Sequence, residues 1–200
     1  MNSKPEPARG LREQKKTEAR HRISDAVIDL MAEGRSDISH DVVAEMTGIS
    51  RRTIYRYFPD RESLLSAASS RVRALAGDGV EFPADEQSLL DTYSIYTGLD
   101  RIAPIATLVR STPQGRAMRM SQKRERQQSY RMATADAVKN LPDDDRVLAT
   151  AMLQVLHTTP WLEMRDHWDL SGEQIARATN WAIRTLLSDL RSRGDTPLDQ

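Results

Sequence analysis

The residues with the clearest chemistry lie in one short stretch, SRRTIYRY, from Ser50 to Tyr57. This stretch holds three arginines and no acid, in a chain whose formal net charge is zero. An arginine can pair with guanine through two hydrogen bonds, a threonine methyl can contact thymine, and a tyrosine hydroxyl can donate to a phosphate oxygen. These residue types therefore indicate contact with nucleic acid, provided that a single helix presents them together.

The flanking sequence predicts a helix-turn-helix, which presents residues in that way. Ser39 can cap a helix that ends near Gly48, and Ser50 can cap the next one. On a helix of 3.6 residues per turn, Ile54 and Phe58 share the face that packs on the preceding helix. In this geometry the second short helix lies in the major groove and its first residues meet base edges. The residues left for contact are Arg51, Arg52, Thr53, Tyr55, Arg56 and Tyr57.

Two further helices are predicted on either side of this pair. Apolar residues recur at i, i+3, i+4 and i+7 in the preceding stretch, which predicts an amphipathic helix over residues 16–33. Pro59 interrupts the chain, and Asp60 can cap a fourth helix that runs to about Leu75. Arg61 lies in its first turn, where a cation beside backbone N–H groups suits a phosphate. Residues 76–86 are rich in helix breakers and mark the end of the domain.

The run DVVAEMTGISRRTIYRYFPDRESLL closely resembles the DNA-binding signature of the TetR family of transcriptional regulators. The turn glycine, threonine, tyrosine, phenylalanine and basic residue are all in register, and the resemblance covers about residues 17–75. It implies that Arg51, Arg52 and Thr53 face bases, while the other contacts reach phosphates or the groove wall. The predicted DNA-contacting residues are therefore Ser39, His40, Ser50, Arg51, Arg52, Thr53, Tyr55, Tyr57 and Arg61.

Helical periodicity continues through the rest of the chain, where strand signals are almost absent. We expect an all-α protein: a helix-turn-helix DNA-binding domain over residues 16–75, then a larger C-terminal helical ligand-binding and dimerisation domain over residues 85–193. Pro160 should break the fourth helix of that domain. The predicted helices of the second domain span about residues 85–97, 99–111, 113–141, 143–168 and 171–193. The resemblance implies a homodimer through the two C-terminal helices and a small-molecule ligand held between the others.

Residues 1–15 are expected to form a flexible N-terminal arm. Residues 1–24 carry seven Lys/Arg against three Asp/Glu, a local balance of +4. Lys15, Lys16, Arg20 and Arg22 can reach adjacent phosphates, or they can belong to a disordered charged tail. The sequence supports both alternatives equally.

Methionines and aromatic residues in the second half suit an adaptable apolar ligand pocket. Each of them fits plain core or a dimer interface as well. The basic segment from Gly115 to Arg131 fits a solvated helix face better than a second nucleic-acid stripe, and a pocket for an acidic ligand is a third possibility. The candidate pocket residues are Tyr93, Tyr96, Met120, Met152, His157 and Trp161.

Several kinds of chemistry have no support in the sequence. With no cysteine, disulfides and thiolate metal sites are excluded, and a reducing compartment is the natural setting. Glu163 and His167 are i, i+4 neighbours, but Pro160 separates them from His157, so we expect no metal. No nucleophile, paired base or glycine-rich phosphate loop stands out, and we expect neither an enzyme nor a cofactor. No segment resembles a membrane span or a signal peptide, which predicts a cytoplasmic protein.

The sequence thus predicts a repressor of palindromic operators that binds double-stranded DNA and is released by a small molecule. The alternative is a helical protein-interaction module whose helix-turn-helix is not selective for DNA. Recovery of one palindrome from random DNA would exclude that alternative, whereas weak, sequence-blind binding that disappears with salt would support it.

Overall fold

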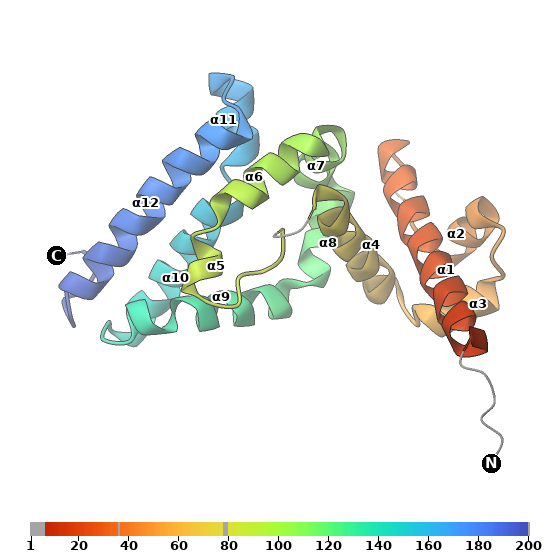
Figure 1. Cartoon of the computed structure of the whole chain (residues 1–200), viewed down its shortest axis with the longest axis horizontal. Helices are drawn as coiled ribbons and strands as arrows, with labels where there is room; N and C mark the ends of the chain where they lie inside the picture. The colour runs from red at the N-terminus through yellow and green to blue at the C-terminus, as the bar shows by residue number, and fades with distance from the viewer. Residues whose placement is uncertain (1–6, 36, 78–79, 200) are drawn as a thin grey trace, which may run out of the picture. The chain divides into compact units, whose positions relative to one another are not determined.

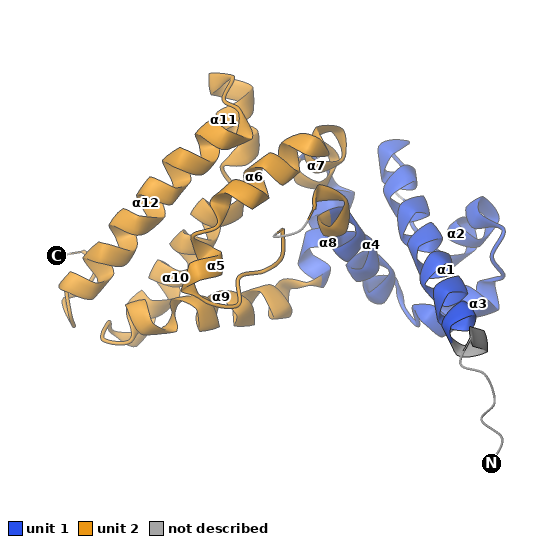
Figure 2. Cartoon of the chain, in the orientation of Figure 1, with its two compact units in different colours: residues 1–72, 111–121 blue, residues 73–110, 122–200 orange. Residues whose placement is uncertain are grey.

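The computed structural model of the protein describes residues 7–35, 37–77 and 80–199, with side chains from residue 10 onward. All regular secondary structure in these residues is helical, which confirms the predicted all-α class (Figure 1). None of the helices in the described ranges is both long enough and apolar enough to span a bilayer. The chain divides into two compact units, residues 1–72 with 111–121 and residues 73–110 with 122–200 (Figure 2).

Unit 1 contains the predicted helix-turn-helix with its flanking helices. Its elements are α1 (Pro7–Ala32), α2 (His40–Thr47), α3 (Arg51–Tyr57), most of α4 (Arg61–Ala76) and α8 (Pro113–Ser121). The second, third and fourth helices begin and end within a residue or two of the predicted positions. The buried side chains of unit 1 include Ile23, Val27, Leu30, Ile38, Val43, Ile54, Phe58, Leu64 and Ala68.

The first helix corrects the prediction of a flexible arm. α1 begins at Pro7 rather than near Lys16, so residues 7–15 are helical. Proline is tolerated in a first helical turn, and the Glu, Gln and Lys residues that follow are good helix formers. The remainder of the predicted arm, residues 1–6, lies outside the described residues.

Unit 2 contains the longer helices of the second half. They are α5 (Glu86–Leu89), α6 (Thr92–Arg101), most of α7 (Ala103–Ser111), α9 (Lys123–Val138), α10 (Asp143–Thr158), α11 (Trp161–Trp168) and α12 (Gly172–Ser192). The break at Pro160 between α10 and α11 was predicted. The core of this unit gathers side chains from α5, α9, α10 and α12, and includes Leu89, Tyr130, Ala137, Leu153, Ile183 and Leu187.

Two predicted helices are divided in the structure. The segment over residues 113–141 breaks at Gln122, whose side chain is buried and accepts a hydrogen bond from Arg73 Nη1 at 2.5 Å. The segment over residues 85–97 splits because Asp85 caps α5 and Asp91 caps α6, each through the backbone N–H three residues later. The predicted domain boundaries also differ from the two units, since α8 groups with unit 1 and the last turn of α4 with unit 2.

Candidate nucleic-acid interface

Side-chain caps and a left-handed glycine define the turn between α2 and α3. Ser39 Oγ accepts from the Val42 backbone N–H, and Ser50 Oγ accepts from that of Thr53. Between them Gly48 adopts φ 68° and ψ 9°, and its N–H donates to Ala44 O. Residues with a Cβ rarely adopt this conformation, so glycine allows α2 to stop and α3 to begin two residues later.

Buried apolar anchors hold α3 in place. Ile54 is 0% and Phe58 2% exposed. The guanidinium of Arg20 on α1 lies over the Phe58 ring, 5.1 Å from its centroid. Arg22, also on α1, donates to the last carbonyl of α2, Thr47 O, at 2.7 Å. The anchors therefore fix the orientation of α3 from one side and leave its opposite side to solvent.

His40, the first residue of α2, also positions α3. Its ring is buried, and Nε2 donates to Phe58 O at 2.7 Å. The same ring stacks on Tyr55, with centroids 4.0 Å apart and 3° between the planes. The side chain of this predicted phosphate contact is thus occupied within the protein. The group that His40 still offers to a phosphate is its backbone N–H at the start of α2.

Arg51 takes part in an exposed network at the start of α3. Its Nε lies 2.8 Å from Asp41 Oδ1, and its guanidinium lies 5.5 Å from the centroid of the Tyr55 ring. The hydrogen bond with Tyr55 and the charge of Asp41 raise the pKa of Arg51. The guanidinium is therefore a permanent cation that Asp41 pairs with on the protein surface.

The next two residues of α3 differ in how they are held. Thr53 is half-buried, and its hydroxyl lies 2.9 Å from that of Ser50. Arg52 is exposed, and its guanidinium pairs with no group among the described residues. Arg52 can therefore reorient on contact with DNA at low cost, while Ser50 and Thr53 offer hydroxyls in a fixed arrangement.

Tyr57 and Arg56 form a second cation and ring pair at the end of α3. Arg56 lies 5.0 Å from the Tyr57 ring centroid, and its Nη2 lies 3.4 Å from the Tyr57 hydroxyl. The pair places a positive charge beside a hydroxyl donor, a combination that suits a phosphate oxygen.

The start of α4 presents the last predicted contact, Arg61. A reciprocal cap fixes this helix end, since Ser63 N donates to Asp60 Oδ1 at 2.7 Å and Asp60 N to Ser63 Oγ at 3.3 Å. Hydrogen bonds from the backbone and the side chain of Ser63 lower the pKa of Asp60. Arg61 follows directly as the first, exposed residue of α4.

Three residues of this site were not among the predicted contacts: Arg20, Asp41 and Arg56. Arg56 is on the exposed part of α3 and was left without a role. Asp41 and Arg51 are ten residues apart across a turn, a spacing that no periodicity connects. For Arg20 the sequence leaves open a phosphate contact or a disordered charged tail, and it does not indicate the contact with Phe58.

The six candidate ligand-pocket residues do not share one environment. Tyr96, His157 and Trp161 are fully buried, whereas Tyr93, Met120 and Met152 are 55%, 41% and 53% exposed. Met120 is moreover part of unit 1. Met152 points outward because α10 turns Leu153 and His157 toward the core. Only the three buried residues remain as interior candidates.

His157 has an unusual environment in the core of unit 2. Its Nδ1 lies 2.6 Å from the Tyr130 hydroxyl, and among the described residues its Nε2 has no hydrogen-bond partner. Burial lowers the pKa of His157 to about 4, and the backbone of Ser88 and the charge of Asp91 act in the opposite direction. The ring is therefore neutral at neutral pH, and one of its polar atoms is unsatisfied.

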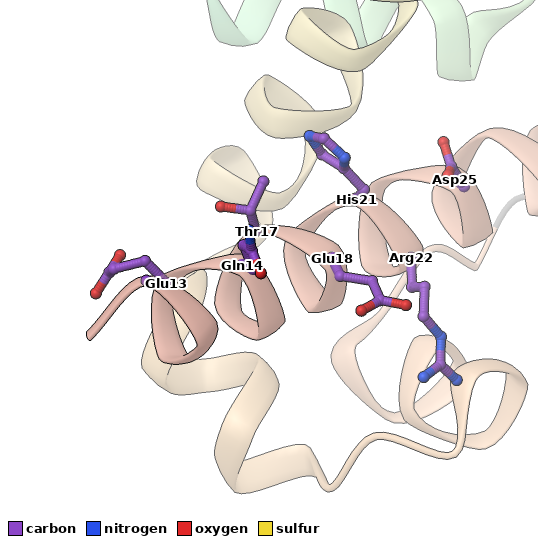
Figure 3. A pocket seen from close by; sticks show the side chains of 8 residues that line it. Glu13, Gln14, Thr17, Glu18, His21, Arg22 and Asp25 are labelled. Carbon is purple, nitrogen blue, oxygen red and sulfur yellow. The ribbon is translucent and has the colours of Figure 1, made fainter. Parts of the chain in front are cut away.

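The surface of the described residues is hollowed at two places away from α3. One, of about 490 Å³, lies between α6 and α12 and is lined by Tyr93, Trp181 and others. The second, of about 680 Å³, runs along α1 and includes Glu13, Glu18 and Asp25 (Figure 3). In the described part of the chain, no group of three or more His, Asp or Glu residues is arranged to hold a metal. Glu163 and His167 pair with each other, at 3.3 Å.

Comparison with known proteins assigns the helix-turn-helix. Residues 28–68 match the family model described as bacterial regulatory proteins, tetR family. No curated protein and no solved structure matches the chain. The matched segment runs from the second half of α1 through α2 and α3 into α4, which are the helices that position Arg51, Arg52 and Arg61. Residues 28–68 are therefore similar to the DNA-binding domain of tetR family regulators, which supports a DNA-binding transcription regulator.

Proposed function

We propose that the protein is a homodimeric repressor that binds palindromic operators and leaves them when a small molecule binds unit 2. DNA recognition is supported by the exposed side of α3, which presents Arg51, Arg52 and Thr53. The helix is capped at one end, and Ile54 and Phe58 anchor it to the core of unit 1. A short helix held in this way can enter the major groove with fixed side chains.

Dimerisation is supported by an apolar stripe on α10. Leu148, Met152 and Val155 recur at i, i+4 and i+7, and they are 59%, 53% and 45% exposed. On α12, Trp181 is 72% exposed. Exposed apolar surface of this kind marks protein interaction sites. Two copies that join through α10 and α12 would bring two α3 helices to a palindrome, with half-site centres about 34–36 Å apart or a multiple of this distance.

Ligand binding is supported by the unsatisfied Nε2 of His157. An unpaired polar atom in a core costs free energy, which a ligand with a hydrogen-bonding group would recover. Tyr96 and Trp161 are also buried, and both belong to unit 2, as His157 does. A small, largely apolar ligand with one polar group beside His157 fits these residues.

The contacts of two adjacent α6 residues support coupling between this region and α4. Arg101 Nη1 donates to Ala76 O, at the end of α4, at 2.8 Å. Asp100 accepts from Trp161 Nε1 at 2.7 Å and from Gly172 N, at the start of α12, at 2.6 Å. A ligand that displaces α11 would thereby shift the end of α4. A coupling of about 1–3 kcal/mol would weaken DNA binding about five- to 150-fold.

Selection of bound fragments from genomic DNA tests this proposal. We expect one palindromic motif, and a dimeric mass in sedimentation that Leu148→Glu reduces to that of the monomer. Met132→Glu, at an exposed apolar position on α9, is the matched control and should leave the dimer intact. Sequence-blind binding would instead support a protein-interaction module, and a monomer bound to single half-sites would exclude the dimeric arrangement.

A further inference from the structure

The first half of α1 extends beyond the core of unit 1. Every residue from Gly10 to Arg22 is exposed except Ala19, which is half-buried. In the second half, Ile23, Val27 and Leu30 are at most 1% exposed. A helix that is polar on all sides and packs against nothing is marginal in water. Apart from the contacts of Arg20 with Phe58 and of Arg22 with Thr47, this half of α1 therefore lacks the packing that its second half has.

One stripe of this exposed half is basic. Arg12, Lys16 and Arg20 recur every four residues. Ile23 and Val27 continue the same face of α1, because residues three or four apart on a helix lie above one another. The face of α1 that buries apolar side chains in unit 1 thus becomes basic where the helix passes beyond the core. Apolar contact is replaced there by charge.

Arg20 connects this stripe to α3. Its guanidinium lies over Phe58, the residue that ends α3. With a rise of about 1.5 Å per residue, Lys16 and Arg12 lie about 6 and 12 Å farther along α1. The basic stripe therefore starts at the end of α3 and leads outward from the helix-turn-helix.

The opposite side of the same half-helix is acidic. Glu18 lies two residues from both Lys16 and Arg20, and this spacing corresponds to a rotation of about 200°. Glu13, Glu18 and Asp25 line the hollow along α1, together with His21 and Arg22 (Figure 3). Lys16 and Glu13 approach within 3.4 Å, but both are exposed, and such surface pairs contribute little. Glu18 is thus kept apart from the stripe of Arg12, Lys16 and Arg20.

We propose that Arg12 and Lys16 hold the first half of α1 against DNA phosphates outside the base pairs contacted by α3. The proposal rests on DNA binding by the helix-turn-helix. Duplex DNA carries one negative charge per about 1.7 Å of its axis, so two cations about 6 Å apart find phosphates in any sequence. The contact lengthens the protected DNA and raises affinity, and it adds no base preference.

The test compares the wild type with Arg12→Gln/Lys16→Gln in the full chain. Glutamine keeps helix propensity while it removes both charges. The matched control is Lys123→Gln/Arg124→Gln, which neutralises an exposed Lys and Arg on α9. The probe is the duplex recovered by genomic selection, once with long flanks and once trimmed to the motif. Affinity is measured across salt concentrations, and hydroxyl-radical footprinting maps the protected backbone.

We expect the slope of log affinity against log salt to become shallower by about 0.9 for each lost phosphate contact. The footprint should shorten at its outer edges, and trimmed DNA should make the wild type behave like the variant. The charge-preserving Arg12→Lys/Lys16→Arg should restore both the slope and the footprint. A slope and footprint equal to those of the wild type would overturn the proposal, as would an equal change in the control.

Failure of operator binding and failure of the phosphate contact give different results. If selection recovers no motif, the proposed operator binding fails, and the same salt titration on a random-sequence duplex still measures the contribution of the stripe. If a motif is recovered and the variant binds it with an unchanged salt slope, only the role of Arg12 and Lys16 is refuted.

Discussion

The imidazole of His40 stacks on the ring of Tyr55, with the centroids 4.0 Å apart and the planes within 3° of parallel. The same imidazole donates to the carbonyl of Phe58 at 2.7 Å. One polar side chain at the start of α2 thus contacts both the middle and the end of α3. The orientation of α3 depends on this contact as well as on the apolar anchors.

Replacement of His40 should therefore weaken both folding and DNA binding. His40→Ala leaves Phe58 O unpaired and removes the stack, so we expect the free energy of unfolding to fall by about 1–3 kcal/mol. His40→Phe keeps a ring against Tyr55 and should lose less. Denaturant unfolding of the wild type, His40→Phe and His40→Ala measures the order of their unfolding free energies. Equal stability of His40→Ala and the wild type would contradict this role of His40.

The pair of Asp41 and Arg51 must rearrange when Arg51 meets a base. Asp41→Asn removes the competing charge, and it also removes an anion from a surface that faces phosphates. We expect tighter DNA binding by the variant, with the gain largest at low salt, where charge interactions are least screened. Binding titrations at two salt concentrations measure this effect. Weaker binding by the variant would mean that Asp41 holds Arg51 in its productive direction.

Arg52 and Arg61 should differ in the kind of contact they make. Arg52→Ala should cost about 1–3 kcal/mol on the selected operator and relax the preference at one base pair. Arg61→Ala should weaken binding to all sequences alike and make the salt dependence shallower. Affinities for the operator and for a panel of single-base variants separate the two patterns. The same pattern for both variants would refute the division into base and phosphate contacts.

His157 should make stability depend on pH in a defined window. Its folded pKa of about 4 lies below the usual value of 6.5, so the unfolded chain binds a proton that the folded chain does not. The stabilising effect of the neutral ring is complete above pH 6.5 and decreases as the pH falls toward 4, by at most about 1.4 kcal/mol per pH unit. Asp91 and Tyr130 are the titratable neighbours.

His157→Phe removes this titration. The unfolding free energy of the variant should therefore differ less between pH 7 and pH 4.5 than that of the wild type. Chemical denaturation at both pH values measures that difference. A variant that loses stability with acid as steeply as the wild type would show that His157 is not the responsible group.

Much of the site follows from local sequence signals. Ser39, Ser50 and Asp60 each precede a helix, and Gly48 and Pro160 stop one, because caps and breakers act within a few residues of chain. The register of α3 follows from Ile54 and Phe58 in the same way. These signals were sufficient to predict α2, α3 and α4 and their exposed residues.

Other features depend on contacts that the sequence does not reveal. Gln122 breaks a continuous helical pattern, and its buried side chain bonds to Arg73, 49 residues away. The burial of His40 could not be predicted, because a lone polar residue at a helix start gives no periodic signal. Asp85 and Asp91 can be recognised as possible helix caps in the sequence, but the apolar pattern across them predicts one helix.

We propose that α3 recognises a specific DNA sequence. The most direct measurement is the dissociation constant of the full chain for the selected operator and for a scrambled duplex of equal length and composition at one physiological salt concentration. We predict that the operator binds about a thousandfold or more tighter, as expected for specific recognition. Equal dissociation constants for the two duplexes would contradict the claim.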